Sequence, residues 1–347
     1  MTVARRAWPI GWREFARVAV FSASASVLGA CSGRQAALDP DGDKAGRIAT
    51  LFWLFTGVAL VVWVAVIAVM IAPLFRRRQP AALPSEPEPA SERRMGMAVA
   101  AASAATVLTL IVLTVASYFT TEGFGAVPSN AVRITLTGKQ WWWQAEYERA
   151  ETSQSFTTAN ELHVPVGRPV QLILESNDVI HSFWVPNLAG KMDLIPGHTN
   201  TLVFTATKPG TYRGQCAEFC GLQHAHMALL IVAEPPAEFE TWRASESEDA
   251  QMPTEPGRGR GLDVFISHGC IACHSIRGTE ANGLLGPDLT HLASRQTIAA
   301  GTLPNSRGNL QGWIADPQGV KPGAKMPRLE LSAADLNAVT DYLTGLK

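Results

Sequence analysis

The residues best suited to chemistry lie in one segment, Cys216-Ala217-Glu218-Phe219-Cys220-Gly221-Leu222-Gln223-His224-Ala225-His226-Met227. A further imidazole, His181, lies upstream in an apolar, strand-like stretch. Thiolate, thioether and imidazole ligands favour copper or zinc over hard cations. Structural zinc takes four Cys or His ligands, whereas a weak axial Met beside Cys and His is typical of electron-transfer copper. Two thiolates on one loop can bridge two coppers, each capped by one histidine. The alternative, a disulfide, leaves the spacing of His224 and Met227 unexplained.

The segment resembles the binuclear CuA loop of cytochrome c oxidase subunit II, with the pattern C-x-E-x-C-x-x-x-H-x-x-M. The resemblance implies Cys216 and Cys220 as bridging thiolates and His181 and His224 as terminal ligands. It implies weak axial ligands from Met227 and the Glu218 backbone carbonyl, and a magnesium ion shared with the catalytic subunit through the Glu218 side chain.

Two neighbouring residues stay outside this ligand set. His226 is expected to be a partly exposed residue of the strand that follows the loop. Asp193 lies in Lys191–Gly197, which resembles the family's loop beside the magnesium. It is either an outer residue of that site or an ordinary turn aspartate.

Residues 122–234 are expected to form one domain of strands, because from Ala131 onward apolar and polar side chains alternate in short segments. Val132, Ile134 and Leu136 show the pattern, and short apolar runs follow at 202–204 and 229–232. A cupredoxin fold fits, with the copper loop joining its last two strands. The stretch Gly138-Lys139-Gln140-Trp141-Trp142-Trp143 resembles a family motif and implies that electrons reach the copper through Trp141. In a strand, three adjacent Trp cannot all face one core.

The C-terminal part carries Cys270-Ile271-Ala272-Cys273-His274, the c-type haem attachment signature. Both thiols would hold the haem, with His274 as proximal ligand and Met326 as sixth ligand. A thioredoxin-like pair would need a βαβ setting, which the flanking residues do not suggest. Gly286-Pro287-Asp288-Leu289 resembles the turn that orients the proximal His in class I cytochromes c. We expect an all-α domain over 257–347, closed by a helix that Ser332 caps, after a Pro- and acid-rich linker at 235–256.

The N-terminal part predicts membrane attachment. Residues 1–30 resemble a lipoprotein signal peptide, and Leu28-Gly29-Ala30-Cys31 implies lipidation of Cys31; an ordinary signal with an incidental thiol is the alternative. Residues 48–74 and 95–121 are uncharged and long enough to span a bilayer. Arginines at 76–78, 93 and 94 place the loop 75–94 in the cytoplasm. The family has an acidic residue that feeds a proton channel near here, and Glu92 is placed for it, although the usual Trp-Thr-x-x-Pro pattern is absent.

The sequence is identified as a member of the subunit II family of bacterial haem-copper oxidases, with a fused cytochrome c. This implies that an external donor, a cytochrome c or a bc complex, feeds haem c and then CuA. Electrons would continue to oxidase subunit I, which reduces dioxygen and pumps protons. The metal domains would lie outside the bacterial inner membrane, in contact with lipid and other oxidase subunits. The net charge of −1 gives no field for nucleic acid.

Two other functions are consistent with parts of the pattern. A membrane-tethered carrier could serve another terminal reductase. A nitrous oxide reductase-like protein shares the copper loop but needs a large propeller domain, for which this chain has no room. A quinol oxidase subunit lacks the copper ligands altogether.

The arginine placement gives a testable topology. A reporter fused after Lys347 should be active only in its extracytoplasmic form, because both spans return the chain to the outside. Activity of a cytoplasm-specific reporter at that position would contradict the two-span arrangement.

Overall fold

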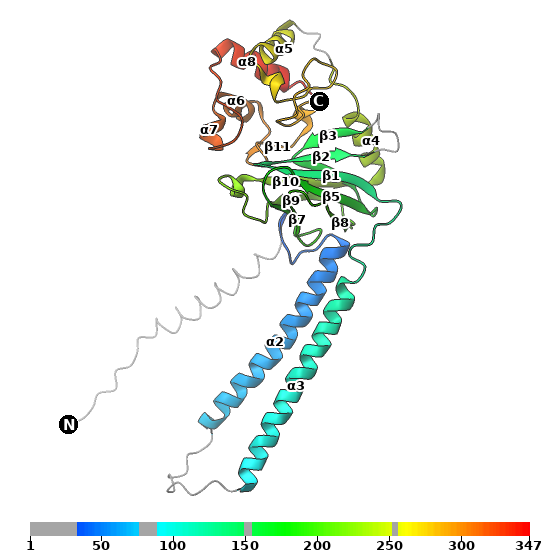
Figure 1. Ribbon diagram of the computed structural model, residues 1–347, viewed down its shortest axis with the longest axis vertical. Coiled ribbons are helices and arrows are strands. Elements are labelled where there is room, and N and C mark those ends of the chain that lie inside the picture. Colours follow the sequence, from blue (N-terminus) through cyan, green and yellow to red (C-terminus); the bar gives the residue numbers. More distant parts are fainter. Residues whose placement is uncertain (1–32, 76–88, 149–154, 252–255) are drawn as a thin grey trace, which may run out of the picture. The chain divides into compact units, whose positions relative to one another are not determined.

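The computed structural model describes residues 33–75, 89–148, 155–251 and 256–347. The signal peptide, Cys31 and residues 76–88 of the expected cytoplasmic loop therefore lie outside the described residues. The chain forms two compact units, one of residues 46–126 and one of residues 1–45 and 127–347. Figure 1 shows the helical pair of the first unit and the sheets and short helices of the second.

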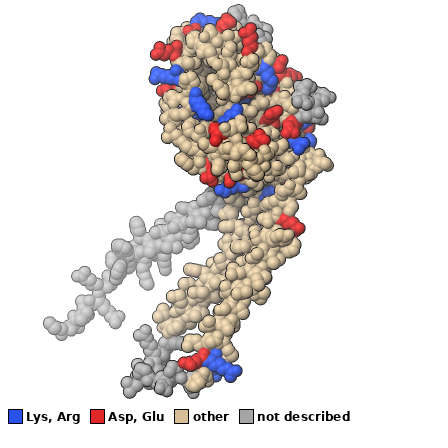
Figure 2. All heavy atoms as spheres, in the orientation of Figure 1, with Lys and Arg blue, Asp and Glu red and all other residues tan. Residues whose placement is uncertain are grey.

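The smaller unit is a pair of long helices, α2 (Asp43–Phe75) and α3 (Pro89–Thr121). Each has 33 residues, about 50 Å at the α-helical rise, and is apolar enough to cross a membrane. Both helices extend beyond the predicted spans. On the face in Figure 2, charged side chains gather near the helix ends. Arg47 Nη2 donates to the carbonyl oxygens of Phe119 at 3.0 Å and Glu122 at 3.3 Å, which joins the start of α2 to the end of α3.

A strap of residues 33–43 precedes α2 and packs on the sheet domain. Asn187 holds it, because its Nδ2 donates to the carbonyl oxygens of Gly33 and Asp39 and its Oδ1 accepts from Ala36 N. The first residues of α2, up to Ala45, thus belong to the same compact unit as the sheet domain.

Residues 132–234 form a β-sandwich with one shared core. One sheet has the order β3-β2-β1-β5-β8 and the other β4-β10-β9, with β6 and β7 as a separate pair. β1 pairs in parallel with β5, and β10 in parallel with β4. The predicted alternation is confirmed, since Ile134 and Leu136 are fully buried. The strands are β1 (Val132–Lys139), β2 (Trp142–Tyr147), β3 (Phe156–Ala159), β4 (Glu161–Pro165), β5 (Val170–Ser176), β6 (His181–Phe183), β7 (Met192–Leu194), β8 (Asn200–Phe204), β9 (Gly210–Gln215) and β10 (Ala228–Glu234).

The first half of the expected linker at 235–256 is a folded part of the sandwich. Residues Pro236–Glu246 form helix α4, and Phe239 is completely buried in the sandwich core. Trp242 packs against the same core, and its ring stacks on that of His163 with 4.2 Å between centroids. The Pro and acidic content predicted a flexible joint. Phe239 and Trp242, three residues apart, share one face of α4 and pack on the sandwich core, so this segment is a helix and not a flexible joint.

The C-terminal domain surrounds a second core. Helix α5 crosses α8 closely at Gly261, where a Cβ would lie 2.2 Å from the Ala338 carbonyl oxygen. Ser332 caps α8 as predicted, since its Oγ accepts from Asp335 N. The domain also has a short hairpin and is therefore not purely helical. Its elements are α5 (Pro256–Ser267), η4 (Cys270–Ala272), η5 (Leu292–Ser294), β11 (Thr297–Ile298), β12 (Leu303–Pro304), α6 (Arg307–Ala315), α7 (Pro317–Val320) and α8 (Ala333–Leu343).

Candidate metal centre and haem site

Two strand ends position the sulfur-rich loop. The loop leaves β9 at Cys216 and joins β10 after Met227, and Cys216 N donates to the Met227 carbonyl oxygen at 2.9 Å. His181 begins β6, on the neighbouring β6–β7 pair. The loop therefore lies between the last two strands, as the resemblance implies.

The expected ligand atoms converge at this point. Cys216 Sγ and Cys220 Sγ lie 3.7 Å apart. Cys216 Sγ is 3.9 Å from His181 Nδ1 and 3.2 Å from the Glu218 carbonyl oxygen. Cys220 Sγ is 3.6 Å from His224 Nδ1 and 3.8 Å from Met227 Sδ. Each sulfur thus has its own imidazole neighbour, and the soft donor set suits copper.

Burial couples the two thiols. The side chains of Cys216, Cys220 and His181 are nearly inaccessible to solvent. The pKa of Cys216 is lowered, chiefly by its hydrogen bond with Cys220, and the pKa of Cys220 is raised by that same hydrogen bond and by burial. A cation is needed for both to become thiolates.

Asp178 contacts a candidate ligand and was not identified from the sequence. Its Oδ1 lies 2.8 Å from His181 Nε2, so it fixes the imidazole with Nδ1 toward the sulfurs. Backbone amides of Gln140 and Val179 also donate to this carboxylate, each at 2.7 Å. Burial opposes ionisation, but hydrogen bonds from His181 and the amides outweigh it and lower the pKa of Asp178. A carboxylate three residues before a ligand histidine was the available signal.

The tryptophan run is split between a turn and a strand. Trp141 lies in the turn after β1 and not in a strand, whereas Trp142 and Trp143 begin β2. Trp143 is fully buried, with its ring centroid 6.1 Å from that of His181. Trp141 Nε1 donates to the Cys220 carbonyl oxygen at 3.0 Å, and Gln140 Nε2 donates to the same oxygen at 2.8 Å. Trp141 therefore contacts the backbone of a copper-ligand candidate directly.

The structure also locates three other residues that the sequence singled out near the loop. The Glu218 side chain is half-buried. Asp193 lies on β7, opposite Ser182 of β6, so it is not a turn residue. His226 is exposed, as expected, but lies in the 3₁₀ turn η3 (His224–His226) and not in the following strand; its Nδ1 is 2.8 Å from Gln223 Oε1.

A second donor set lies in the C-terminal domain. Cys270 and Cys273 are half-buried and unpaired at the two ends of a tight turn, and His274 follows. His274 Nδ1 donates to the Pro287 carbonyl oxygen at 2.8 Å, which leaves Nε2 as the ligand atom. Burial lowers the pKa of His274 and keeps the imidazole neutral. Gly286 lies against this ring, where a Cβ would be 2.7 Å from Cε1.

Met326 is half-buried in a loop after α7. Gln318 fixes this loop, because its Nε2 donates to the carbonyl oxygens of Ala324 and Met326, each at 2.8 Å. Gly323 N donates back to Gln318 Oε1 at 2.9 Å. The loop that carries the expected sixth ligand is thus held by one side chain.

Comparisons with known proteins match both domains. Residues 149–234 match the family described as cytochrome c oxidase subunit II, periplasmic domain, and residues 259–347 match cytochrome c. The chain is 32% identical over 262 residues to cytochrome c oxidase subunit 2 of Bacillus sp. strain PS3, covering 70% of this chain and 72% of that protein. The chain belongs to the cytochrome c oxidase subunit II family.

Two further comparisons show how far the similarity extends. Cytochrome c oxidase subunit 2 of Alkalihalophilus pseudofirmus is 40% identical over 222 residues, covering 64% of this chain and 63% of that protein. The chain thus spans somewhat less than two thirds of that relative. The crystal structure of the periplasmic domain of subunit II of cytochrome oxidase from Bradyrhizobium japonicum is 33% identical, with a TM-score of 0.33, and covers 35% of this chain and 96% of that one.

Family membership implies copper in the first domain of this subunit II and haem in the second, and the residues present fit both groups. The copper set has two sulfurs, two imidazoles, a thioether and a carbonyl within one loop and its neighbour. The haem set has two thiols and an imidazole whose Nδ1 is already bonded. Leu284 and Leu285, in the segment between Gly283 and Gly286, are 77% and 74% exposed, as suits a site for an apolar macrocycle.

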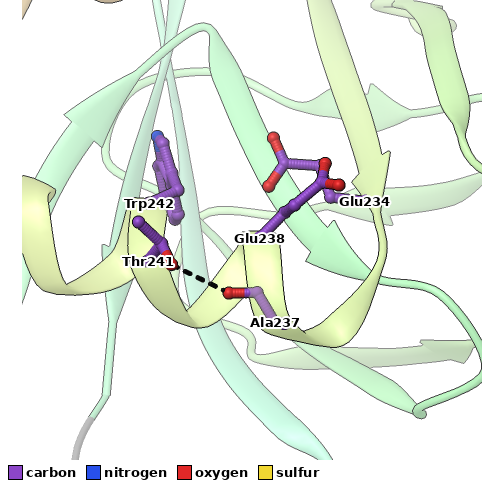
Figure 3. Close-up of a pocket in the computed structure, with 5 residues that line it drawn as sticks. All are labelled: Glu234, Ala237, Glu238, Thr241 and Trp242. Carbon is purple, nitrogen blue, oxygen red and sulfur yellow. Dashed lines mark hydrogen bonds between the residues drawn. The ribbon is translucent and has the colours of Figure 1, made fainter.

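A hollow elsewhere on the subunit does not belong to either site. Figure 3 shows it on α4, with Trp242 and Glu234 among its lining residues; its volume is about 410 Å³. It contains no thiol or imidazole ligand. We assign it no function.

The Asp178 contact predicts weaker metal binding when it is lost. In Asp178→Ala, His181 would lose its partner at Nε2, and copper affinity should fall by about 10–100-fold. Competition with a chelator in the full-length protein measures this. Asn177→Ala, at the exposed neighbouring position, is the matched control and should bind normally. Equal affinity in the two variants would show that Asp178 does not support the site.

Proposed function

We propose that this chain is the electron-accepting subunit of a haem-copper oxidase, and that it takes electrons at its haem domain and delivers them through its copper domain. Its partner would be the catalytic subunit that reduces dioxygen to water. The observation that carries the proposal is the position of Trp141. Its indole N–H bonds to Cys220 of the copper loop, and its carbonyl oxygen accepts from Lys321 of the haem domain. One residue thus contacts both domains.

The copper domain would hold a binuclear centre. Cys216 and Cys220 would bridge the metals, His181 and His224 would be terminal ligands, and Met227 and the Glu218 carbonyl would bind weakly. When bound, this centre and the haem supply one-electron chemistry without bond making. The protein contributes burial, which excludes water, and Asp178, which fixes His181.

The haem domain would bind haem c covalently through Cys270 and Cys273, with His274 and Met326 as axial ligands. Pro287 fixes the His274 tautomer through its carbonyl oxygen. An external donor, a cytochrome c or a bc complex, would reduce this domain. The copper loop would face subunit I, and Glu218 would contribute to a shared magnesium site.

The helical hairpin would anchor the chain in the bacterial inner membrane, with both redox domains on the periplasmic side. Cys31 would carry a lipid if the signal peptide is of the lipoprotein type. Glu92, in the first turn of α3, would lie at the cytoplasmic end and assist proton uptake by the partner. Proton translocation itself would belong to that partner.

The copper assignment is tested with Cys216→Ser in the purified oxidase. One bridging thiolate is lost, so the mixed-valence signal in the electron paramagnetic resonance spectrum should disappear. Haem c absorption should remain, because its ligands belong to a separate core. Cys220→Ser should behave in the same way. Loss of both chromophores from a folded protein would contradict the two independent sites.

The haem assignment is tested with Met326→Ala. Covalent haem should persist through Cys270 and Cys273, but the reduction potential should fall, because loss of the thioether removes the ligand that raises it. Potentiometry and the Met–iron charge-transfer band measure the change. If both remain as in the unaltered protein, another residue is the sixth ligand.

A further inference from the structure

Lys321 is a buried cation that belongs to neither donor set. It is 3% exposed, lies at the end of α7 and precedes Met326 by five residues. Its Nζ donates to the carbonyl oxygens of Trp141 at 2.7 Å, His226 at 2.8 Å and Ala299 at 3.2 Å. An ammonium group has three N–H donors, so every donor has an acceptor. Two acceptors belong to the copper domain and one to the haem domain.

The two copper-domain carbonyls adjoin the copper ligands. Trp141 donates its indole N–H to Cys220, and His226 immediately precedes Met227. Lys321 therefore reaches the copper domain at two points on either side of the ligand loop. None of its three hydrogen-bond acceptors is a carboxylate, so the contact depends on neutral acceptors in a site that excludes water.

The third acceptor comes from a turn with an uncommon backbone. Ala299 and Ala300 have φ angles of 52° and 57°, in the left-handed region that non-glycine residues rarely adopt. The Ala299 carbonyl accepts from Lys321, and the Ala300 carbonyl accepts from Ala228 N of the copper domain at 3.0 Å. This turn thus bonds to Lys321 and to the first residue of β10.

The loop after Lys321 makes a further contact with the copper loop. Gln223 Nε2 donates to the Pro322 carbonyl oxygen at 2.7 Å. A Cβ on Gly323 would lie 2.8 Å from Leu222 Cδ2, so a glycine permits the close approach. Since Gln318 holds this loop as far as Met326, the position of Lys321 is linked to that of the sixth-ligand candidate.

We propose that Lys321 is the positioning residue that docks the haem domain on the copper loop, and that this docking sets the rate of electron transfer within the chain. The proposal rests on the function proposed above and names the contact that it uses. With both groups bound, the transfer would take one electron from haem c and give one electron to the copper centre, with no bond made or broken. Burial lowers the pKa of Lys321 to about 7, so the ammonium form with all three donors prevails below that pH.

The test uses the purified oxidase with the Lys321→Met variant. Methionine keeps an unbranched apolar stem but leaves buried carbonyls without donors, so docking should weaken about tenfold or more. Copper reduction after flash reduction of haem c should slow by a similar factor. Direct reduction of copper by a small artificial donor, the haem potential and both spectra should be unchanged. A purely structural role in either domain would alter these controls.

Arg328→Met is the matched control. It removes a positive charge from the same loop, but Arg328 is exposed to solvent and Lys321 is buried. Its transfer rate should stay near that of the unaltered protein. Equal slowing in both variants would attribute the effect to loop charge and overturn the proposal.

Hydrogen exchange separates docking from electron transfer. We call the contact between the copper and haem domains the seam. The Ala228 amide donates across it to the Ala300 carbonyl oxygen, whereas the Leu230 amide donates to the Asn160 carbonyl oxygen within the copper domain. In Lys321→Met, exchange at Ala228 should speed up while Leu230 keeps its protection. Unchanged exchange at Ala228 would overturn the role of Lys321 and leave the proposed function intact. Faster exchange with an unchanged transfer rate would instead overturn the route within the chain.

A milder variant covers the case in which Lys321→Met does not assemble. Lys321→Gln keeps two N–H donors on a shorter side chain, so Ala228 exchange and copper reduction should both change in the same direction by a smaller factor. If this variant matched the unaltered protein in both measurements, the proposal would be wrong.

Discussion

Two buried sulfur atoms 3.7 Å apart are the constraint on which the copper domain depends. Neither sulfur can be solvated, and two thiolates at this distance repel each other unless a cation lies between them. The fold brings them together nonetheless, because the Cys216 amide bonds to the Met227 carbonyl and so closes the loop at its base. Strands β9 and β10 fix the two ends of that base. The sandwich thus provides the rigid support, and the loop provides the ligands.

A second group of buried charges lies where the haem domain meets the sandwich. His163 Nδ1 lies 2.5 Å from Glu234 Oε1, and Glu161 Oε2 accepts from Gln296 N of the haem domain at 2.9 Å. Burial opposes protonation of His163, but the two carboxylates outweigh it and raise the pKa. The stability that protonated His163 contributes is therefore complete below the ordinary histidine pKa, and it is lost as the pH rises through the raised pKa of His163. Arg277 reinforces the seam through the Thr157 and Glu246 carbonyl oxygens.

The sequence predicted best what is local. Strand alternation, the loop between the last strands and the Ser332 cap depend on residues near one another in the chain, and the structure confirms them. The pairing of His181 with Cys216 required the family resemblance, because 35 residues separate them. Lys321 could not be found in this way, since its acceptors come from three distant segments and its own neighbours suggest an exposed loop. Helix α4 was mistaken for a linker because Pro and Glu content outweighed the face shared by Phe239 and Trp242.

The burial of α4 shortens the flexible connection that the predicted linker at 235–256 would have provided between the domains. Phe239 lies in the sandwich core, whereas Ala250 lies in the haem-domain core and bonds to the Arg277 carbonyl, so little free chain remains between the domains. Residues 122–250 carry 15 acidic and 8 basic residues, while residues 255–347 carry 8 and 9, so long-range attraction is weak. Salt screens such fields beyond roughly 10 Å. The contact between the domains instead relies on short hydrogen bonds, among them those of Lys321 to neutral carbonyls and that of the Gln296 amide to the Glu161 carboxylate. The proposed electron transfer within the chain should therefore depend little on ionic strength.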